Sequence, residues 1–292
     1  MPTTTPFSLP SAALTLDALQ PVGASHDDVR RYSRARRNLL PRADHVAAVC
    51  GGWAHGVVLR SDAVIDPVID PVIDTVLWCP GRRAHPDLAA TALATAARAT
   101  RAFRISERTL ARIQPDATAP ALLSLVRLPQ WDIAALLTDD ARLVLVADGI
   151  EYAGNLGTLI RTVDACGADG LVLTGATARL THPKVFTASR GTVLTTPVLT
   201  FGSVGAARSA LAAAGFTAYV ADPAGAMPYR KAGLGLSRTA VVVGSEGDGV
   251  SEQWREGLTR VSIPMRGRAD SLNVAVSAAV LLFEARAALD GG

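Results

Sequence analysis

The chain has 292 residues, a length that allows two domains of ordinary size or one large domain. It is 49% hydrophobic and 19% charged but only 5% aromatic, so its core must consist mainly of Ala, Val, Leu and Ile. Its net charge of +3 is compatible with an anionic partner but does not require one. No apolar run of about 18 or more residues predicts a membrane span, and no signal peptide is expected. The three cysteines are far apart, so we expect neither a disulfide framework nor a zinc site, and we expect a cytoplasmic protein.

The N-terminal region divides into two parts. Residues 1–25 are rich in Thr, Pro and Ser, which predicts a flexible terminus. Asp27 and Asp28 follow, and basic residues come after them, an order that suits the dipole of a helix. This segment is either a solvated helix face or a contact for RNA phosphates. Its candidate RNA-binding residues are Arg30, Arg31, Arg34, Arg36 and Arg37.

The segment up to residue 130 is expected to form a small α/β domain, covering residues 26–130. A four-residue unit repeats between Asp62 and Asp74, and Pro67 and Pro71 exclude a regular helix or a central strand there. We interpret the repeat as an expanded surface loop ahead of a strand over 75–78. The Ala-rich and Arg-rich residues 87–112 predict a helix, and residues 121–127 a strand.

The pattern after residue 141 is an alternation of short apolar strands and helices. Such a pattern predicts a parallel sheet covered by helices on both faces, and ligands of these sheets bind at the carboxyl ends of the strands. The expected strands cover residues 143–147, 171–174, 217–221, 240–243 and 261–263. The expected helices cover residues 156–166, 204–214 and 272–289.

The first motif of this half runs from Glu151 to Gly167. It follows a strand and opens a helix that Asn155 can cap and Gly167 can end. Arg161 lies almost opposite the apolar stripe of that helix, so it should point toward solvent, RNA or another subunit. An ordinary surface arginine is the plain alternative.

The second motif is a glycine-rich turn after a strand, with Gly244, Glu246, Gly247 and Gly249. Glycines let the backbone approach a ligand closely. The spacing is neither that of a dinucleotide fingerprint nor that of a phosphate loop, which would also need a Lys. Glu246 would repel a phosphate, so the turn suits a ligand with cationic or hydroxyl groups better.

The third motif runs from Ser262 to Val274. A strand should end near Pro264, and Ser271 is a suitable N-cap for the helix that follows, with Asn273 in its first turn. That helix is apolar all round through Phe283, which predicts burial of most of its faces. Helix capping alone could explain both Ser271 and Asn273.

Taken together, NLGTLIR, GSEGDGV and IPMRGRADSLNV resemble the three motifs of the SpoU/TrmH family of SPOUT methyltransferases, in order and at similar separations. The resemblance covers roughly residues 141–289. The N-terminal half resembles, far more weakly, the small α/β RNA-binding domain of many members. Ala153 departs from the pattern, because many members have proline there.

The resemblance implies a fold and an activity. The fold would be a SPOUT methyltransferase domain over residues 141–292 with a parallel sheet and a trefoil knot. The activity would be transfer of a methyl group from S-adenosylmethionine, without a metal, to a ribose 2′-OH of RNA. The implied cofactor-binding residues are Val243, Gly244, Ile263, Met265, Ser271 and Leu272. The implied catalytic residues are Asn155, Arg161, Glu246, Ser271 and Asn273.

The resemblance also implies partners. Members are usually homodimers with sites at the interface, and a separate recognition domain favours ribosomal (23S) RNA as the substrate. Transfer RNA is the alternative substrate, and a non-catalytic RNA-binding protein of the same fold is the alternative function. A nucleotide-binding enzyme with a Rossmann-like site is disfavoured by the glycine spacing.

Overall fold

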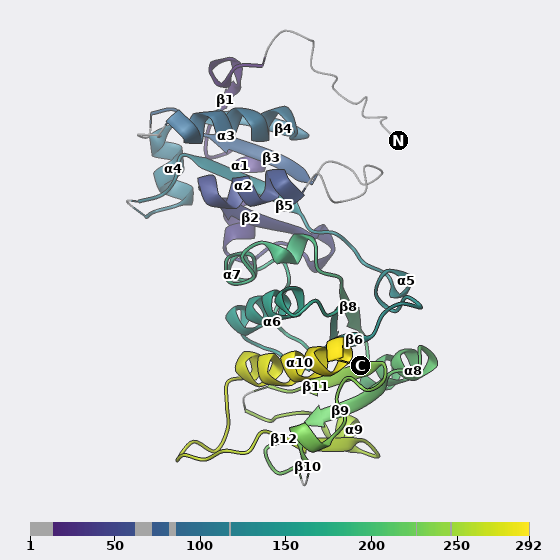
Figure 1. Ribbon diagram of the computed structural model, residues 1–292. Helices are drawn as coiled ribbons and strands as arrows, with labels where there is room; N and C mark the ends of the chain where they lie inside the picture. The colour runs from purple at the N-terminus through teal and green to yellow at the C-terminus, as the bar shows by residue number, and fades with distance from the viewer. Residues whose placement is uncertain are drawn as a thin grey trace. The chain divides into compact units, whose positions relative to one another are not determined.

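The structure is a computed structural model that describes residues 14–61, 72–81, 86–116, 118–225, 227–245 and 247–291. Its residues form two compact units (Figure 1), one within Met1–Arg34 and Val49–Val126, the other within Ala35–Ala48 and Arg127–Gly292. Residues 35–48 therefore belong with the second unit, although the sequence placed them in the N-terminal domain. Most of the repeat after Asp62 lies outside the described residues.

Apart from residues 46–48 of β2, which group with the second unit, the first unit contains a five-stranded sheet in the order β1-β4-β3-β5-β2. Strands β1, β4 and β3 are parallel, and β5 is antiparallel to β3. The strands are β1 (Gln20–Val22), β2 (Val46–Cys50), β3 (Ile73–Trp78), β4 (Arg101–Ile105) and β5 (Leu122–Arg127). Its helices are α1 (Asp27–Arg36), α2 (Gly52–Ser61), α3 (Pro86–Ala97) and α4 (Glu107–Ile113).

Two expectations for this unit were wrong. Residues 20–22, assigned to a flexible terminus, form an edge strand that pairs with β4. The single helix expected over 87–112 is instead two helices separated by β4, because residues 101–105 pair with β3 on one side and β1 on the other. Ile105 is buried and Ser106 caps the second helix by accepting from the Thr109 N–H. Sheet pairing here overrides the helix propensity of an Ala-rich and Arg-rich segment.

A buried imidazole links α2 to β5 in this unit. The His55 Nδ1 lies 2.7 Å from the Gly51 carbonyl oxygen, and its Nε2 lies 2.8 Å from the Ser124 Oγ. The carbonyl can only accept, so Nδ1 carries the proton and Nε2 accepts from the serine hydroxyl. Burial lowers the pKa of His55 to about 4, against a smaller opposing effect of the Gly51 carbonyl. The ring is therefore neutral at neutral pH.

This burial predicts a pH-dependent stability. Between pH 6.5 and about 4 the unfolded chain binds a proton at His55 and the folded chain does not, so stability should fall as the pH falls. The shift corresponds to roughly 3 kcal/mol. Urea unfolding of His55→Gln between pH 4 and 7 should show a shallower pH dependence than the wild type. The exposed His45→Asn variant should keep the wild-type dependence, and an equal slope in all three proteins would contradict the assignment.

The second unit contains a seven-stranded sheet in the order β10-β12-β9-β11-β6-β7-β8, and its paired strands are all parallel, as the sequence predicted. The short edge strands β8 and β10 were not predicted. The strands are β6 (Leu143–Asp148), β7 (Gly170–Thr174), β8 (Val198–Phe201), β9 (Thr217–Ala221), β10 (Met227–Pro228), β11 (Thr239–Val243) and β12 (Thr259–Ser262). The helices are α5 (Ile133–Leu136), α6 (Ala153–Ala165), α7 (Pro183–Ala188), α8 (Val204–Ala213), α9 (Glu252–Arg255) and α10 (Val274–Gly291).

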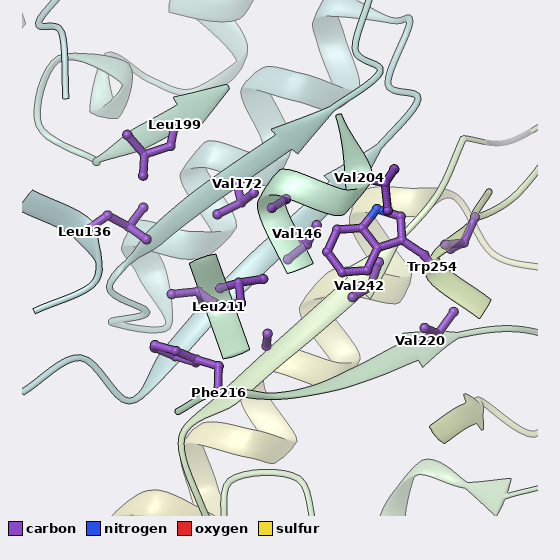
Figure 2. Packing of buried hydrophobic residues seen from close by; sticks show 14 of the residues in the cluster. Leu136, Val146, Val172, Leu199, Val204, Leu211, Phe216, Val220, Val242 and Trp254 are labelled. Carbon is purple, nitrogen blue, oxygen red and sulfur yellow. The ribbon is translucent and has the colours of Figure 1, made fainter. Parts of the chain in front are cut away.

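Helices cover both faces of this sheet. On one face, Val146 and Val242 pack with residues of α8 and with Trp254 of α9, as Figure 2 shows. On the other face, α10 packs on β6 and β11, and α6 packs on β7 and on α10. Because side chains alternate along a strand, these central strands bury residues toward both layers. Among the described helices, none is long and apolar enough to cross a membrane.

The segment of residues 35–48 is attached to the second unit by hydrogen bonds from arginine. Arg179, which follows β7, donates from its two Nη atoms to the carbonyls of Asn38 and Leu40, at 2.9 and 2.8 Å. Arg42 donates in return to the carbonyl of Thr177, at 3.3 Å. These bonds explain why the segment groups with residues far from it in sequence.

Candidate functional site

A cavity of about 480 Å³ lies at the carboxyl ends of β9, β11 and β12, next to the start of α10. This is the edge at which parallel sheets bind ligands, and the volume falls within the range of about 300–1,000 Å³ typical of small-molecule sites. The structure brings all six expected cofactor-binding residues into its lining. These residues are Val243, Gly244, Ile263, Met265, Ser271 and Leu272.

The glycine-rich turn closes on itself beside this cavity. Ser245 and Gly249 exchange two backbone hydrogen bonds, each of 3.1 Å. A Cβ added at Gly244 would lie 2.0 Å from the Gly249 carbonyl carbon, so no other residue fits there without moving the backbone. Gly249 has a φ of +68°, which also favours glycine. The two glycines are required by the turn itself, and the turn leaves backbone groups lining the cavity.

A buried carboxylate that sequence reasoning missed fixes the far end of this turn. Asp148, the last residue of β6, accepts from the Thr174 hydroxyl at 2.7 Å and from the Ser251 N–H at 2.9 Å. Trp254 of α9 donates its indole N–H to the Thr174 oxygen at 3.1 Å. The sequence did contain a signal, because Asp148 ends the apolar run LVLVAD. A carboxylate buried at the end of such a strand needs hydrogen-bond partners, which would have predicted a polar network there.

The charged residues of the cavity are all carboxylates. Asp222, Asp248 and Asp270 line it, and its described lining contains no Lys, Arg or His. Asp222 is partly neutralised by Arg260 and Arg255, which lie 3.4 and 4.0 Å away. Such a lining would repel a nucleotide phosphate and favours a ligand that carries positive charge.

The start of α10 differs from the expectation. The helix begins at Val274, and the cap is Asn273 rather than Ser271: the Asn273 Oδ1 accepts from the Ala275 N–H at 2.9 Å. Ser271 lies before the helix, and its hydroxyl donates to Asp270 at 3.4 Å. The side chain of asparagine caps as well as that of serine, so the sequence alone did not decide between the two positions.

The structure joins the first and third motifs through one amide pair. The Asn273 Nδ2 donates to the Asn155 Oδ1 at 3.3 Å. Asn155 is therefore not the cap of α6, as expected, but lies in its first turn, and Tyr152 occupies the cap position. Gly167, with a φ of +65°, ends the helix as expected, and its N–H donates to the Asp164 carbonyl.

Arg161 and Glu246 complete the expected catalytic set but are not found in this cavity. Arg161 is exposed on α6, as predicted, and makes no hydrogen bond or ion pair with the described part of the chain. Glu246 lies outside the described residues. The cavity of one chain therefore contains Ser271 and Asn273 but not the expected arginine.

The arginines of α1 are not equivalent. Arg31 turns inward and donates to the buried Asp74 at 2.6 Å, and Arg101 holds the same carboxylate at 2.7 Å. Arg30 pairs with Asp27, which lies on the surface. Arg34 and Arg37 are exposed, whereas Arg36 is half-buried. Among the described residues, no group of three or more His, Cys, Asp or Glu is arranged to hold a metal ion.

Comparison with known proteins decides the family. The SpoU rRNA Methylase family matches residues 142–283. The chain is 31% identical over 185 residues to the Bacillus subtilis protein named 23S rRNA (guanosine(2553)-2′-O)-methyltransferase RlmP, an alignment covering 63% of this chain and 72% of that protein. The chain belongs to the SpoU/TrmH family of RNA 2′-O-methyltransferases.

Other SpoU/TrmH proteins are similar over different lengths. A putative TrmH family tRNA/rRNA methyltransferase of Staphylococcus saprophyticus is 31% identical over 147 residues, which cover 50% of this chain and 59% of that protein. The crystal structure of the SpoU methyltransferase AviRb from Streptomyces viridochromogenes shares the fold, with a TM-score of 0.73, 24% identity and coverage of 90% of this chain and 97% of AviRb. An RNA 2′-O ribose methyltransferase structure has a TM-score of 0.68 and 26% identity, over 91% of this chain and 97% of the other.

The closed turn of this SpoU/TrmH domain generates a prediction. Gly244→Ala should destabilise the protein by about 1–3 kcal/mol, because its methyl group overlaps backbone that cannot move aside cheaply. Gly247→Ala, three residues away, meets nothing within 4 Å and should be nearly neutral. Urea unfolding measures both. Equal stability of the two variants would show that the turn does not need its close backbone contact.

Proposed function

We propose that this protein transfers a methyl group from S-adenosylmethionine to a ribose 2′-OH of ribosomal RNA. The single observation that carries the proposal is the cavity, because all six expected cofactor-binding residues line it and the charged groups of its described lining are all carboxylates. The relative named as a 23S rRNA 2′-O-methyltransferase supports this choice of substrate. Transfer RNA is the alternative substrate, since other relatives are named tRNA/rRNA methyltransferases. An enzyme with either substrate would act in the cytoplasm.

The residues of the cavity fit the methyl donor. Val243, Ile263 and Leu272 provide apolar walls for an adenine ring, and the backbone at Gly244 can approach it closely. The nearby carboxylates suit a ligand with sulfonium and ammonium charges, where a phosphate would be repelled. Met265 and Ser271 complete the predicted binding set. When bound, S-adenosylmethionine supplies an electrophilic methyl group together with a neutral leaving group, so no metal is needed.

The polar groups beside the donor cavity would orient the acceptor. The ribose 2′-OH is a weak nucleophile at neutral pH, so it must be held in line with the methyl group and lose a proton during the transfer. Asn155 and Asn273 already share a hydrogen bond at this place, and Ser271 lies two residues before Asn273. We assign these three side chains to positioning the ribose and the donor, and we assign the same task to Glu246.

Arg161 would act on the RNA side of the site. Its guanidinium stays protonated at any physiological pH, so it suits contact with the ribose-phosphate and stabilisation of negative charge better than proton removal. Because it does not line the cavity of its own chain, we propose that it serves the cavity of a second copy.

An exposed apolar stripe supports this homodimer. Leu272, Val276 and Phe283 are 37%, 49% and 51% exposed, and the spacing of four and seven residues places Val276 and Phe283 on one face of α10. The sequence predicted burial of most faces of this helix, and these exposed residues mark the face that its own chain leaves uncovered. A second copy of the chain would cover the stripe, and α6, which carries Arg161, packs directly against α10.

Two further parts of the proposal follow from the family. The C-terminal segment would pass through a loop as a trefoil knot and hold the donor in a bent shape. The N-terminal α/β domain would bind RNA, with exposed Arg30 and Arg34 contacting phosphates, and exposed Arg37 of the adjoining segment would do the same. Arg31 belongs to this predicted set as well, but its guanidinium pairs with the buried Asp74 and so helps to stabilise the fold.

A thermal-shift assay tests the proposed donor. S-adenosylmethionine at about 100 times its Kd should raise the stability by roughly 2.7 kcal/mol, a rise in Tm of about 5 °C or more. ATP and NAD should produce little shift, because the charged residues in the described lining are carboxylates, which repel phosphates. The matched variant Ile263→Arg, which fills the cavity, should lose the response. A larger shift with ATP or NAD than with S-adenosylmethionine would contradict the proposal.

Subunit complementation tests the placement of Arg161. Arg161→Ala should lose methyl transfer and keep donor binding, whereas Ile263→Arg should lose both. Co-expression of the two inactive chains should restore about a quarter of wild-type activity, because half of the dimers are mixed and each has one intact site of two. Arg142→Ala is the control and should remain active, because this exposed arginine precedes β6 at the amino ends of the strands, opposite the cavity. Absence of complementation by co-purified mixed dimers would place Arg161 in the site of its own chain.

A further inference from the structure

A second cavity, of about 510 Å³, lies within the second unit at the start of α6. It is lined by residues 151–155 at the start of α6, by residues between β7 and α7, by Lys184 in the first turn of α7 and by Asn38. Its volume is similar to that of the donor cavity and suits one nucleotide. The residues that matter for its chemistry are Glu151, Tyr152, Asn155, Thr177, His182 and Lys184.

This second cavity adjoins the donor cavity. Asn155 lines the second cavity, and Asn273 lines the donor cavity. Their side chains are hydrogen-bonded at 3.3 Å, so one amide pair separates the two spaces. Methyl transfer requires the methyl carbon and the ribose 2′-OH to come within about 3–3.5 Å of each other. A ribose held at the edge of the second cavity would lie on the side of the donor cavity where this approach is possible.

The second cavity, unlike the first, offers a cation. Lys184 is one of two lysines in the chain, and its ammonium group makes no ion pair or hydrogen bond with the described residues. Its side chain crosses the helix start, because a Cβ at Gly154 would lie 3.2 Å from the Lys184 Cε and 3.6 Å from its Nζ. Arg179 also lines the cavity, but two of its donors already bind the carbonyls of Asn38 and Leu40.

A hydrogen-bond donor and an aromatic ring accompany the lysine. The His182 Nδ1 accepts from the Lys184 N–H at 3.0 Å, so the neutral ring carries its proton on Nε2 and can donate from there. Burial, and then the charge of Lys184, lower the pKa of His182 and favour this neutral form. The ring of Tyr152 is 64% exposed and is available for a base to stack upon.

We propose that this cavity binds the RNA nucleotide that adjoins the methylated ribose, with its phosphate at Lys184 and His182 and its base against Tyr152. The inference rests on the proposed function, because it takes the first cavity as the donor site. Only an unstacked base can stack on an aromatic side chain such as that of Tyr152, so the bound nucleotide would be single-stranded. The choice of RNA target would then depend partly on the catalytic unit itself.

The same cavity contains an opposing charge that sharpens the test. Glu151 lines it as well and would repel a phosphate held at Lys184. Removing the positive charge and removing the negative charge should therefore change RNA affinity in opposite directions. A purely structural role for either side chain predicts no such opposition.

The experiment measures filter binding of the full-length protein to unmodified 23S ribosomal RNA transcribed in vitro, over a range of salt concentrations. Lys184→Gln should weaken binding roughly fivefold at moderate salt and reduce the slope of log affinity against log salt by about 0.7. Lys231→Gln, the other lysine of the chain, is the charge-matched control and should leave both unchanged. Glu151→Gln should tighten binding, and Tyr152→Leu should weaken it about fivefold or more while Tyr152→Phe retains the affinity.

Donor binding separates this inference from the proposed function. Each variant should keep the wild-type thermal shift with S-adenosylmethionine, which also shows that it is folded. If the wild type binds donor and RNA, but Lys184→Gln matches Lys231→Gln or Glu151→Gln fails to tighten binding, the nucleotide site is wrong and the methyltransferase proposal stands. If the wild type binds neither donor nor RNA, the proposed function fails, and this inference fails with it.

Discussion

The carboxylate of Asp148 is the constraint on which the candidate site depends most. It is buried at the end of the central strand β6, where an unpaired charge would be costly, and it is satisfied by the Thr174 hydroxyl and the Ser251 N–H. These bonds tie β7 to the end of the glycine-rich turn, and the Trp254 indole extends the network into the core beneath. The turn is therefore held at both ends, by its own closure at Gly244 and by this network, so its backbone can present a fixed wall to a ligand.

Two cavities of opposite charge meet at the amide pair of Asn155 and Asn273. Asp222, Asp248 and Asp270 line the first, while Lys184, which pairs with no group of the described chain, brings a cation to the second. A cationic methyl donor is favoured by nearby carboxylates, and an anionic RNA phosphate is favoured by a nearby cation. The first cavity therefore suits the donor and the second suits the RNA. The amide side chains at the boundary are neutral and can hydrogen-bond to either ligand.

Some of this arrangement could be predicted from sequence and some could not. The apolar runs after residue 141 predicted the parallel sheet, because strands buried on both faces leave a clear pattern. The cofactor-binding residues from Val243 to Leu272 were predicted from the resemblance to the SpoU/TrmH motifs, and strand placement alone did not single them out. The strand of residues 101–105 was missed because its stability comes from neighbouring strands rather than from its own composition. The cap at Asn273 is a local bond that a serine could equally have made, so the sequence did not decide its position, whereas the bond from Asn273 to Asn155 is a tertiary contact that spacing does not encode.

The most direct test of the central claim is the chemical identity of the product. Unmodified 23S ribosomal RNA would be incubated with the protein and S-adenosylmethionine carrying an isotopically labelled methyl group, digested to nucleosides and analysed by mass spectrometry. The account predicts label in a 2′-O-methylnucleoside at one position, and its loss with Ile263→Arg. Label on a base, or no label although the protein binds both donor and RNA, would contradict it.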